Sequence, residues 1–121
     1  MFIQAWGNMG TAWPVVNQHF GVRPDLGRGR LEIVPQLPSD APIAAEDIRL
    51  GDGSADVTAA RYGDRYITKV DLHKVDLRRL RIGHTLPRGS DVRSVKLDGR
   101  RVQWRERRTN RGLEVLSLIH I

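Results

Sequence analysis

The regular spacing of turn signals constrains the fold of this 121-residue chain more than any other feature. From residue 31 onward, short runs rich in β-branched and other apolar residues alternate with clusters of glycine, proline and aspartate. A turn about every eight to twelve residues is typical of an antiparallel β-sandwich or barrel. We expect a mainly β fold, an antiparallel β-sandwich. The expected strands are residues 31–34, 43–50, 55–61, 66–72, 77–84, 92–97, 102–107 and 113–118.

The sharpest local prediction is a β-hairpin around the pair Asp98-Gly99. An Asp-Gly loop favours a type I′ turn, which would place Leu97 opposite Arg100. The same register sets Val95 opposite Val102 and Arg93 opposite Trp104. We expect one face of this hairpin in the core and the other in solvent. The core face would carry Val95, Leu97, Val102 and Trp104, and the wet face Ser94, Lys96, Arg101, Gln103 and Arg105.

One helix is expected before the sandwich, over residues 11–20. Thr11 can serve as its N-cap, Pro14 is tolerated in the first turn, and Gly21 suits the position after the end. An apolar stripe recurs at helical spacing and consists of Trp13, Val16 and Phe20. Because a helix this short is marginal alone, it requires a surface to pack on.

The net charge of +6 arises entirely in the C-terminal part of the chain. Residues 73–121 hold thirteen Lys/Arg against five Asp/Glu, whereas residues 1–72 hold seven against nine. A basic nucleic-acid-binding domain is therefore one alternative, although no aromatic platform interleaves the arginines. Its contacts would come from Arg100, Arg101, Arg105, Arg107, Arg108 and Arg111. We favour a solvated sheet face instead, and so we do not favour nucleic acid as a partner.

The usual catalytic and metal-binding patterns are absent from the sequence. The chain has no cysteine and no G-x-S-x-G motif. Its histidines, His19, His73, His84 and His120, lack the spacing that would place two imidazoles on one metal, so we interpret them as surface or packing residues. The carboxylates Glu46, Asp47, Asp52 and Asp56 flank turns, and we interpret them as turn caps rather than as catalytic acids. We expect no metal and no cofactor.

The cellular context is expected to be cytoplasmic. No apolar run approaches the roughly 20 residues of a membrane-spanning helix, so no membrane partner is expected. The first six residues also lack the basic and apolar regions of a secretory signal.

The opening of the chain is chemically suited to a sugar ligand. Within residues 4–13, two tryptophans lie among two amide side chains and two glycines. An indole ring can stack on the apolar face of a sugar, and amides can bind its hydroxyls. The candidate substrate-binding residues are Gln4, Trp6 and Asn8. Trp13 is interpreted as a packing residue.

Residues 4–16, QAWGNMGTAWPVV, resemble the segment that opens the last helix of six-hairpin (α/α) toroid glycosidases. The similarity is to bacterial glycogen-debranching and glucoamylase-like enzymes. It continues through residues 21–35, GVRPDLGRGRLEIVP. Residues 47–51 (DIRLG) and 82–87 (IGHTLP) resemble the small β-sandwich that follows that toroid. The resemblance covers most of the chain, up to about residue 115.

This resemblance implies a C-terminal fragment of a glycosidase acting on α-glucan. Twelve toroid helices of about 11 residues each would already exceed the chain, so only the last helix fits. Residues 1–26 would be this terminal helix of an incomplete (α/α)6 toroid. Residues 27–121 would be the C-terminal β-sandwich, with 116–121 an artefactual or truncated tail.

The role implied for this fragment is mainly structural. The catalytic acid and base of such enzymes lie on toroid loops that no position here matches, so no catalytic residue is carried over. The Gln4–Trp6 loop lies near the sugar-binding cleft in relatives. The implied partners are the missing N-terminal toroid and an oligo- or polysaccharide. The alternative is a carbohydrate-binding β-sandwich module whose stacking platform would be Trp104, Tyr62 and Tyr66.

Overall fold

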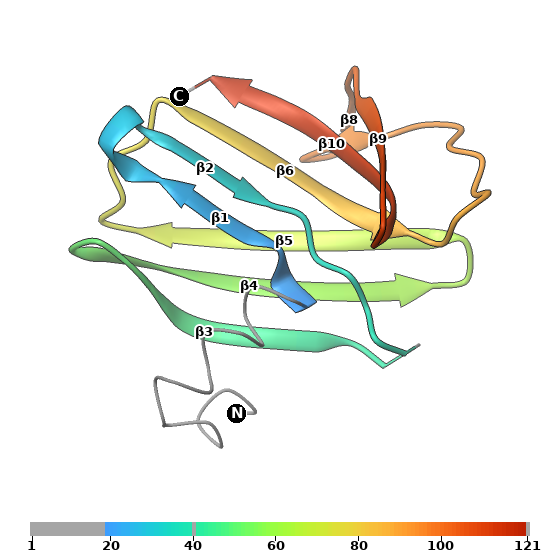
Figure 1. The fold of residues 1–121 in the computed structure, drawn as a ribbon, viewed down its shortest axis with the longest axis horizontal. Helices are drawn as coiled ribbons and strands as arrows, with labels where there is room; N and C mark the ends of the chain where they lie inside the picture. Colours follow the sequence, from blue (N-terminus) through green and yellow to red (C-terminus); the bar gives the residue numbers. More distant parts are fainter. Residues whose placement is uncertain (1–18, 40, 121) are drawn as a thin grey trace.

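The computed structural model describes residues 19–39 and 41–120, which form two stacked sheets and a separate small hairpin (Figure 1). The expectation of a mainly β fold is confirmed. The elements in chain order are β1 (Val22–Asp25), the 3-10 helix η3 (Leu26–Arg28), β2 (Arg30–Ile33), β3 (Ile43–Leu50), β4 (Gly53–Tyr62), β5 (Arg65–His73), β6 (Arg79–Leu86), β7 (Lys96–Leu97), β8 (Arg100–Arg101), β9 (Arg105–Thr109) and β10 (Gly112–His120).

The larger sheet has five strands in the order β1-β2-β6-β10-β9. Its neighbours pair antiparallel except β2 and β6, which run parallel and place Glu32 beside Arg81. The prediction of a purely antiparallel sandwich is therefore wrong at this one pair. The parallel pair arises because the chain leaves β2, builds the whole second sheet, and then returns to the strand it left.

The smaller sheet has three antiparallel strands in the order β3-β4-β5, and it packs against the larger sheet. In Figure 1 its strands run at an angle to β2, β6 and β10, as is usual for twisted sheets packed face to face. The core lies between the two sheets. It contains Phe20, Val22, Leu31, Ile33, Ala45, Ile48, Leu50, Ala55, Val57, Leu77 and Leu80.

The expected N-terminal helix is not supported. Trp13 and Val16 lie outside the described residues, and the described part contains no helix longer than the three residues of η3. Phe20, the last member of the expected apolar stripe, is fully buried in the sandwich core instead. Residues 22–25, which we grouped with the helix, form β1 at the edge of the larger sheet.

Backbone pairing explains why the chain is extended at this point. The amide of Val34 donates to the carbonyl of Gly21 (3.2 Å), and the amide of Gln36 donates to the carbonyl of His19 (2.7 Å). Gly21 has a φ of +56°, and a Cβ there would overlap the carbonyl oxygen of Val34. The glycine that suggested a helix end therefore serves a close approach between two extended segments.

The predicted hairpin at Asp98-Gly99 is confirmed in its central register. Leu97 pairs with Arg100, and the amide of Val102 donates to the carbonyl of Val95 (3.0 Å). Both turn residues have positive φ, 51° and 81°, as a type I′ turn requires. The pairing of Arg93 with Trp104 falls outside this short ladder. The expected core face is half-buried, and the expected wet face is exposed.

Residues 116–120 belong to the sheet. They form the second half of β10, which pairs with β6 as far as His120 opposite Arg79. Leu116 and Ser117 are buried within it. Separately, among the described residues no helix is long and apolar enough to cross a membrane.

Candidate functional site

The predicted sugar-binding residues Gln4, Trp6 and Asn8 all lie outside the described residues. The proposed role of this loop therefore stays a prediction. The other candidates from the sequence lie within the described residues.

The aromatic platform expected of a carbohydrate-binding module does not form. Tyr62 and Tyr66 both lie on the β4–β5 hairpin. Tyr62 pairs with Arg65, and Tyr66 pairs with Arg61, the residue before Tyr62. Alternation along a strand then sends the two rings to opposite faces of the sheet. Tyr62 is exposed, whereas Tyr66 packs against the ring of His84 with centroids 5.0 Å apart. The half-buried Trp104 instead donates its indole N–H to Glu106 (3.0 Å).

Among the acidic residues around 46–56, the contacts give Asp56 a structural role in a bulge of β3. The pairing of β3 with β4 shifts between Ala45 and Ile48, which marks a β-bulge. Within this bulge Asp47 has a φ of 56°, and its amide donates to Asp56 Oδ1 (2.8 Å). That hydrogen bond, together with His73 at 3.1 Å from Asp56 Oδ2, lowers the pKa of Asp56. Asp56, which we interpreted as a turn cap, thus lies within β4 and accepts from a backbone amide in the bulge instead of capping a turn.

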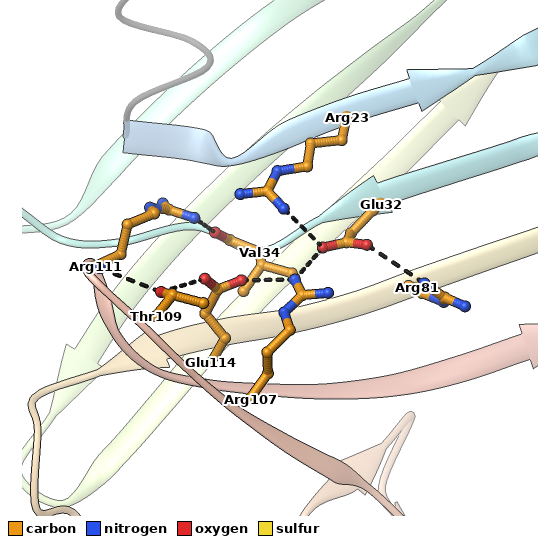
Figure 2. Close-up of polar contacts among 8 residues, drawn as sticks. All are labelled: Arg23, Glu32, Val34, Arg81, Arg107, Thr109, Arg111 and Glu114. Atoms are coloured by element: carbon orange, nitrogen blue, oxygen red, sulfur yellow. Dashed lines mark hydrogen bonds and ion pairs between the residues drawn. The ribbon is translucent and has the colours of Figure 1, made fainter.

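The outer face of the larger sheet carries a buried ion cluster that the sequence did not predict (Figure 2). We define this buried ion cluster as Arg23, Glu32, Arg81, Arg107, Thr109, Arg111 and Glu114. Its centre is Glu114, whose side chain is completely buried. Glu114 accepts hydrogen bonds from Arg107 (2.7 Å) and from the hydroxyl of Thr109 (2.6 Å).

Arg107 joins the two carboxylates of the buried ion cluster. It also donates to Glu32, which lies on β2 and receives Arg23 (3.8 Å) and Arg81 (3.7 Å) from the strands on either side. Its hydrogen bonds to Glu32 and Glu114 raise the pKa of Arg107 further. Burial raises the pKa of Glu114, but the bonds from Thr109 and Arg107 outweigh this effect and lower it overall. Arg107 and Glu114 therefore both stay charged near neutral pH, and the cluster connects the five strands of the larger sheet and the β9–β10 turn.

Contacts within the buried ion cluster occupy two of the six arginines considered for nucleic-acid binding. Arg107 is held by carboxylates, and Arg111 donates to the backbone carbonyl of Val34 (3.2 Å). Alternation along β9 places Arg107 and Arg108 on opposite faces of the sheet. The six arginines therefore do not form one continuous basic surface.

His84 is the described histidine with the most unusual surroundings. It lies on β6, it is 5% exposed, and burial lowers its pKa to about 4. The Thr68 hydroxyl donates its single hydrogen to the carbonyl of Gly83 (2.7 Å). The 3.1 Å contact between Thr68 Oγ1 and His84 Nδ1 must therefore have the imidazole as donor, which leaves Nε2 as an unprotonated acceptor. Nε2 is buried and has no partner among the described residues.

A groove of about 960 Å³ opens beside this histidine. Within residues 19–39 and 41–120 the smaller sheet has three strands, and β5 is at its edge. The groove runs between that edge, the inner faces of β6 and β10, and the segment 90–97. A smaller hollow of about 270 Å³ adjoins it and shares Arg61, Tyr66, Leu86 and Pro87 with it. Tyr66 thus stands at the junction of the two spaces. The Arg61 guanidinium lies 5.2 Å from the centroid of its ring.

The walls of the groove mix apolar and polar groups. Its apolar lining includes Ile67, Ile82, Val92, Val95 and Val115. Its polar lining includes Thr68, His84, Ser90, Ser94 and Ser117, and its charged lining consists of Arg61, Asp64, Arg65, Asp91, Arg93 and Lys96. Sequence reasoning missed this groove, although the alternation of Leu80, Ile82 and His84 on one strand face was a signal that His84 points inward.

No family model, curated protein or solved structure matches this chain. Within residues 19–39 and 41–120, no group of three or more histidine and carboxylate side chains is placed to hold a metal ion.

Proposed function

We propose that this chain is the C-terminal, mainly structural part of a cytoplasmic glycoside hydrolase that acts on α-glucan, of the glycogen-debranching or glucoamylase-like kind. Its partner is the N-terminal toroid of the same protein. The resemblance of residues 4–16 and 21–35 supports this assignment. The mainly β fold of the described residues is compatible with it, because a β-sandwich follows the toroid in the enzymes that these segments resemble.

The observation that carries the non-catalytic role is the state of the buried and paired carboxyl groups. A glycosidase needs one carboxylic acid with a raised pKa across the scissile bond from a second carboxylate. Here the contacts of Asp56 and of Glu114 lower the pKa of each, which is the opposite of what a general acid requires. Glu32 is committed to three arginines. These carboxylates stabilise the fold and are not free to move protons.

The proposal is tested by the reading frame upstream of Met1 and by turnover. We expect this frame to encode several helical hairpins with acidic loops. The longer protein should release glucose from glycogen or maltodextrin, whereas the isolated chain should release none. Glucose release by the pure isolated chain, or an upstream frame without helical hairpins, would contradict the proposal.

A further inference from the structure

We propose that the groove beside Tyr66 binds a short α-glucan oligosaccharide, with a sugar hydroxyl donating to Nε2 of His84. The choice of α-glucan rests on the proposed function, whereas the choice of a polyhydroxylated ligand rests on the groove itself. Hydrogen bonding, size and the character of the walls of the groove all support this ligand.

His84, on β6, supplies the hydrogen-bonding evidence. Its Nε2 is buried without a partner in the described part of the chain, and the residue lines the groove. A buried polar group without a hydrogen bond is unfavourable and rare in folded proteins. A hydroxyl of a ligand in the groove can supply this missing hydrogen bond by donating to Nε2.

Access to His84 Nε2 runs past Tyr66. This nitrogen has less than 1 Å² of accessible surface, so the ligand reaches it when the half-buried Tyr66 ring shifts. This ring borders both spaces and packs against His84. Ligand binding is therefore coupled to a change in the surroundings of Tyr66 and of the His84 imidazole.

The volume of the groove fits a short oligosaccharide. The groove measures about 960 Å³, and the adjoining hollow adds about 270 Å³. Ligand sites in proteins commonly measure roughly 300 to 1,000 Å³. The groove lies at the upper end of this range, which gives room for a chain of a few sugar units.

The walls of the groove fit a neutral ligand with both polar and apolar faces. The apolar side chains from β5, β6, β10 and the segment 90–97 can contact the C–H face of a sugar ring. Charges of both signs line the same groove, namely Arg61, Arg65, Arg93 and Lys96 with Asp64 and Asp91. Donors and acceptors are thus both present, as the hydroxyls of a sugar require.

The first experiment needs no variant. The chain is titrated with maltotriose and with maltoheptaose, while the ring nitrogens of its histidines are followed by NMR. We expect the Nε2 signal of His84 to shift with saturation. The signal of His73, which is exposed on the distant end of β5 and contacts Asp56, should stay constant. A His84 signal that does not move at saturating sugar overturns the proposal.

The second experiment compares matched variants by calorimetry. We expect Tyr66→Ala to change the affinity for maltoheptaose at least tenfold, because the ligand has to pass this ring, whereas Tyr62→Ala, on the other face of the same hairpin, leaves the affinity unchanged. His84→Asn keeps a group near Nδ1 for Thr68 but loses the Nε2 acceptor, so binding should weaken. His84→Gln, whose amide reaches the Nε2 position, should bind better than His84→Asn. Equal binding by Tyr66→Ala and Tyr62→Ala overturns the proposal.

Control ligands separate this proposal from the proposed function. A response to cellotriose or to inorganic phosphate, with none to maltotriose, overturns the α-glucan site. Maltotriose binding by a chain whose upstream frame lacks helical hairpins supports the groove and contradicts the hydrolase assignment. An upstream frame that encodes a toroid, together with no shift of the His84 signal on sugar addition, supports the hydrolase assignment and contradicts the sugar-binding groove.

Discussion

At the scale of single residues, two buried groups dominate the electrostatics, and they do so in opposite ways. His84 is buried in its neutral form, because burial disfavours the charged imidazolium and lowers its pKa to about 4. Glu114 is buried in its charged form, because Arg107 and Thr109 surround it with donors. Burial alone therefore does not decide the protonation state of a group, because the hydrogen-bond and charge partners that the fold supplies also matter.

The neutral state of His84 predicts a pH dependence of stability. Its pKa falls from 6.5 in the unfolded chain to about 4 in the folded one, so between these values the unfolded state binds more protons. The free energy of unfolding should therefore be highest above pH 6.5 and decrease toward pH 4, by roughly 3 kcal/mol in total. Urea unfolding of the chain and of His84→Gln across this range measures the effect. The variant should show a flatter profile, and two parallel profiles would contradict the prediction.

Removal of Glu114 should destabilise the protein strongly. In Glu114→Ala the guanidinium of Arg107 keeps only Glu32, and the Thr109 hydroxyl loses its acceptor. Breaking a buried ion pair by removing one partner typically costs about 3 to 5 kcal/mol. Chemical denaturation should show a loss of this order, whereas Glu46→Ala, at an exposed position of β3, should change stability by less than about 0.5 kcal/mol. A loss below about 1 kcal/mol for Glu114→Ala would show that the cluster is dispensable.

At the scale of elements, the bulge in β3 shows how one carboxylate accompanies a shift in the register of a strand pair. The spacing Ala45 to Ile48 places two apolar side chains inward across an interval of three residues, where a regular strand would use two. The extra residue is accommodated by the positive φ of Asp47 and by the hydrogen bond to Asp56. The pattern in the sequence already contained this irregular interval.

Loss of the Asp56 carboxylate should loosen the bulge locally. In Asp56→Ala the amide of Asp47 loses its acceptor, so we expect its hydrogen exchange to become at least tenfold faster. The amides that pair β4 with β5 should keep their protection, because they do not depend on this side chain. Asp52→Ala, in the adjoining β3–β4 turn, serves as the control. Unchanged exchange of the Asp47 amide in Asp56→Ala would mean that the bulge is held by the strands alone.

Most strands could be predicted from local patterns, but their partners could not. The expected strand 43–50 coincides with β3, and the Asp98-Gly99 turn fixed its own hairpin because both required residues are adjacent. In contrast, β1 contains Pro24 and charged residues, and it is a strand only because it pairs with β2. Local pattern favours the strand that buries apolar residues, and it carries little information about an exposed edge strand.

At the scale of the whole molecule, the sequence could not reveal the features that depend on long-range placement. In the sequence, Glu32 and Glu114 look like ordinary solvent-facing residues of an apolar strand. Only the pairing of β2, β6, β10 and β9 brings both carboxylates to Arg107. The groove has the same origin. It exists because a sheet of three strands packs on a sheet of five, and no single segment of the chain contains that difference.

The position of β10 has a consequence for biosynthesis. This strand is the last one described in chain order, yet it lies between β6 and β9 within the larger sheet. A ribosome delivers β6 well before residues 112–120, so a nascent chain carries an open row of backbone donors and acceptors along β6 during that interval. Completion of the larger sheet has to wait for β10 to leave the exit tunnel, and until then self-association through this open edge competes with folding.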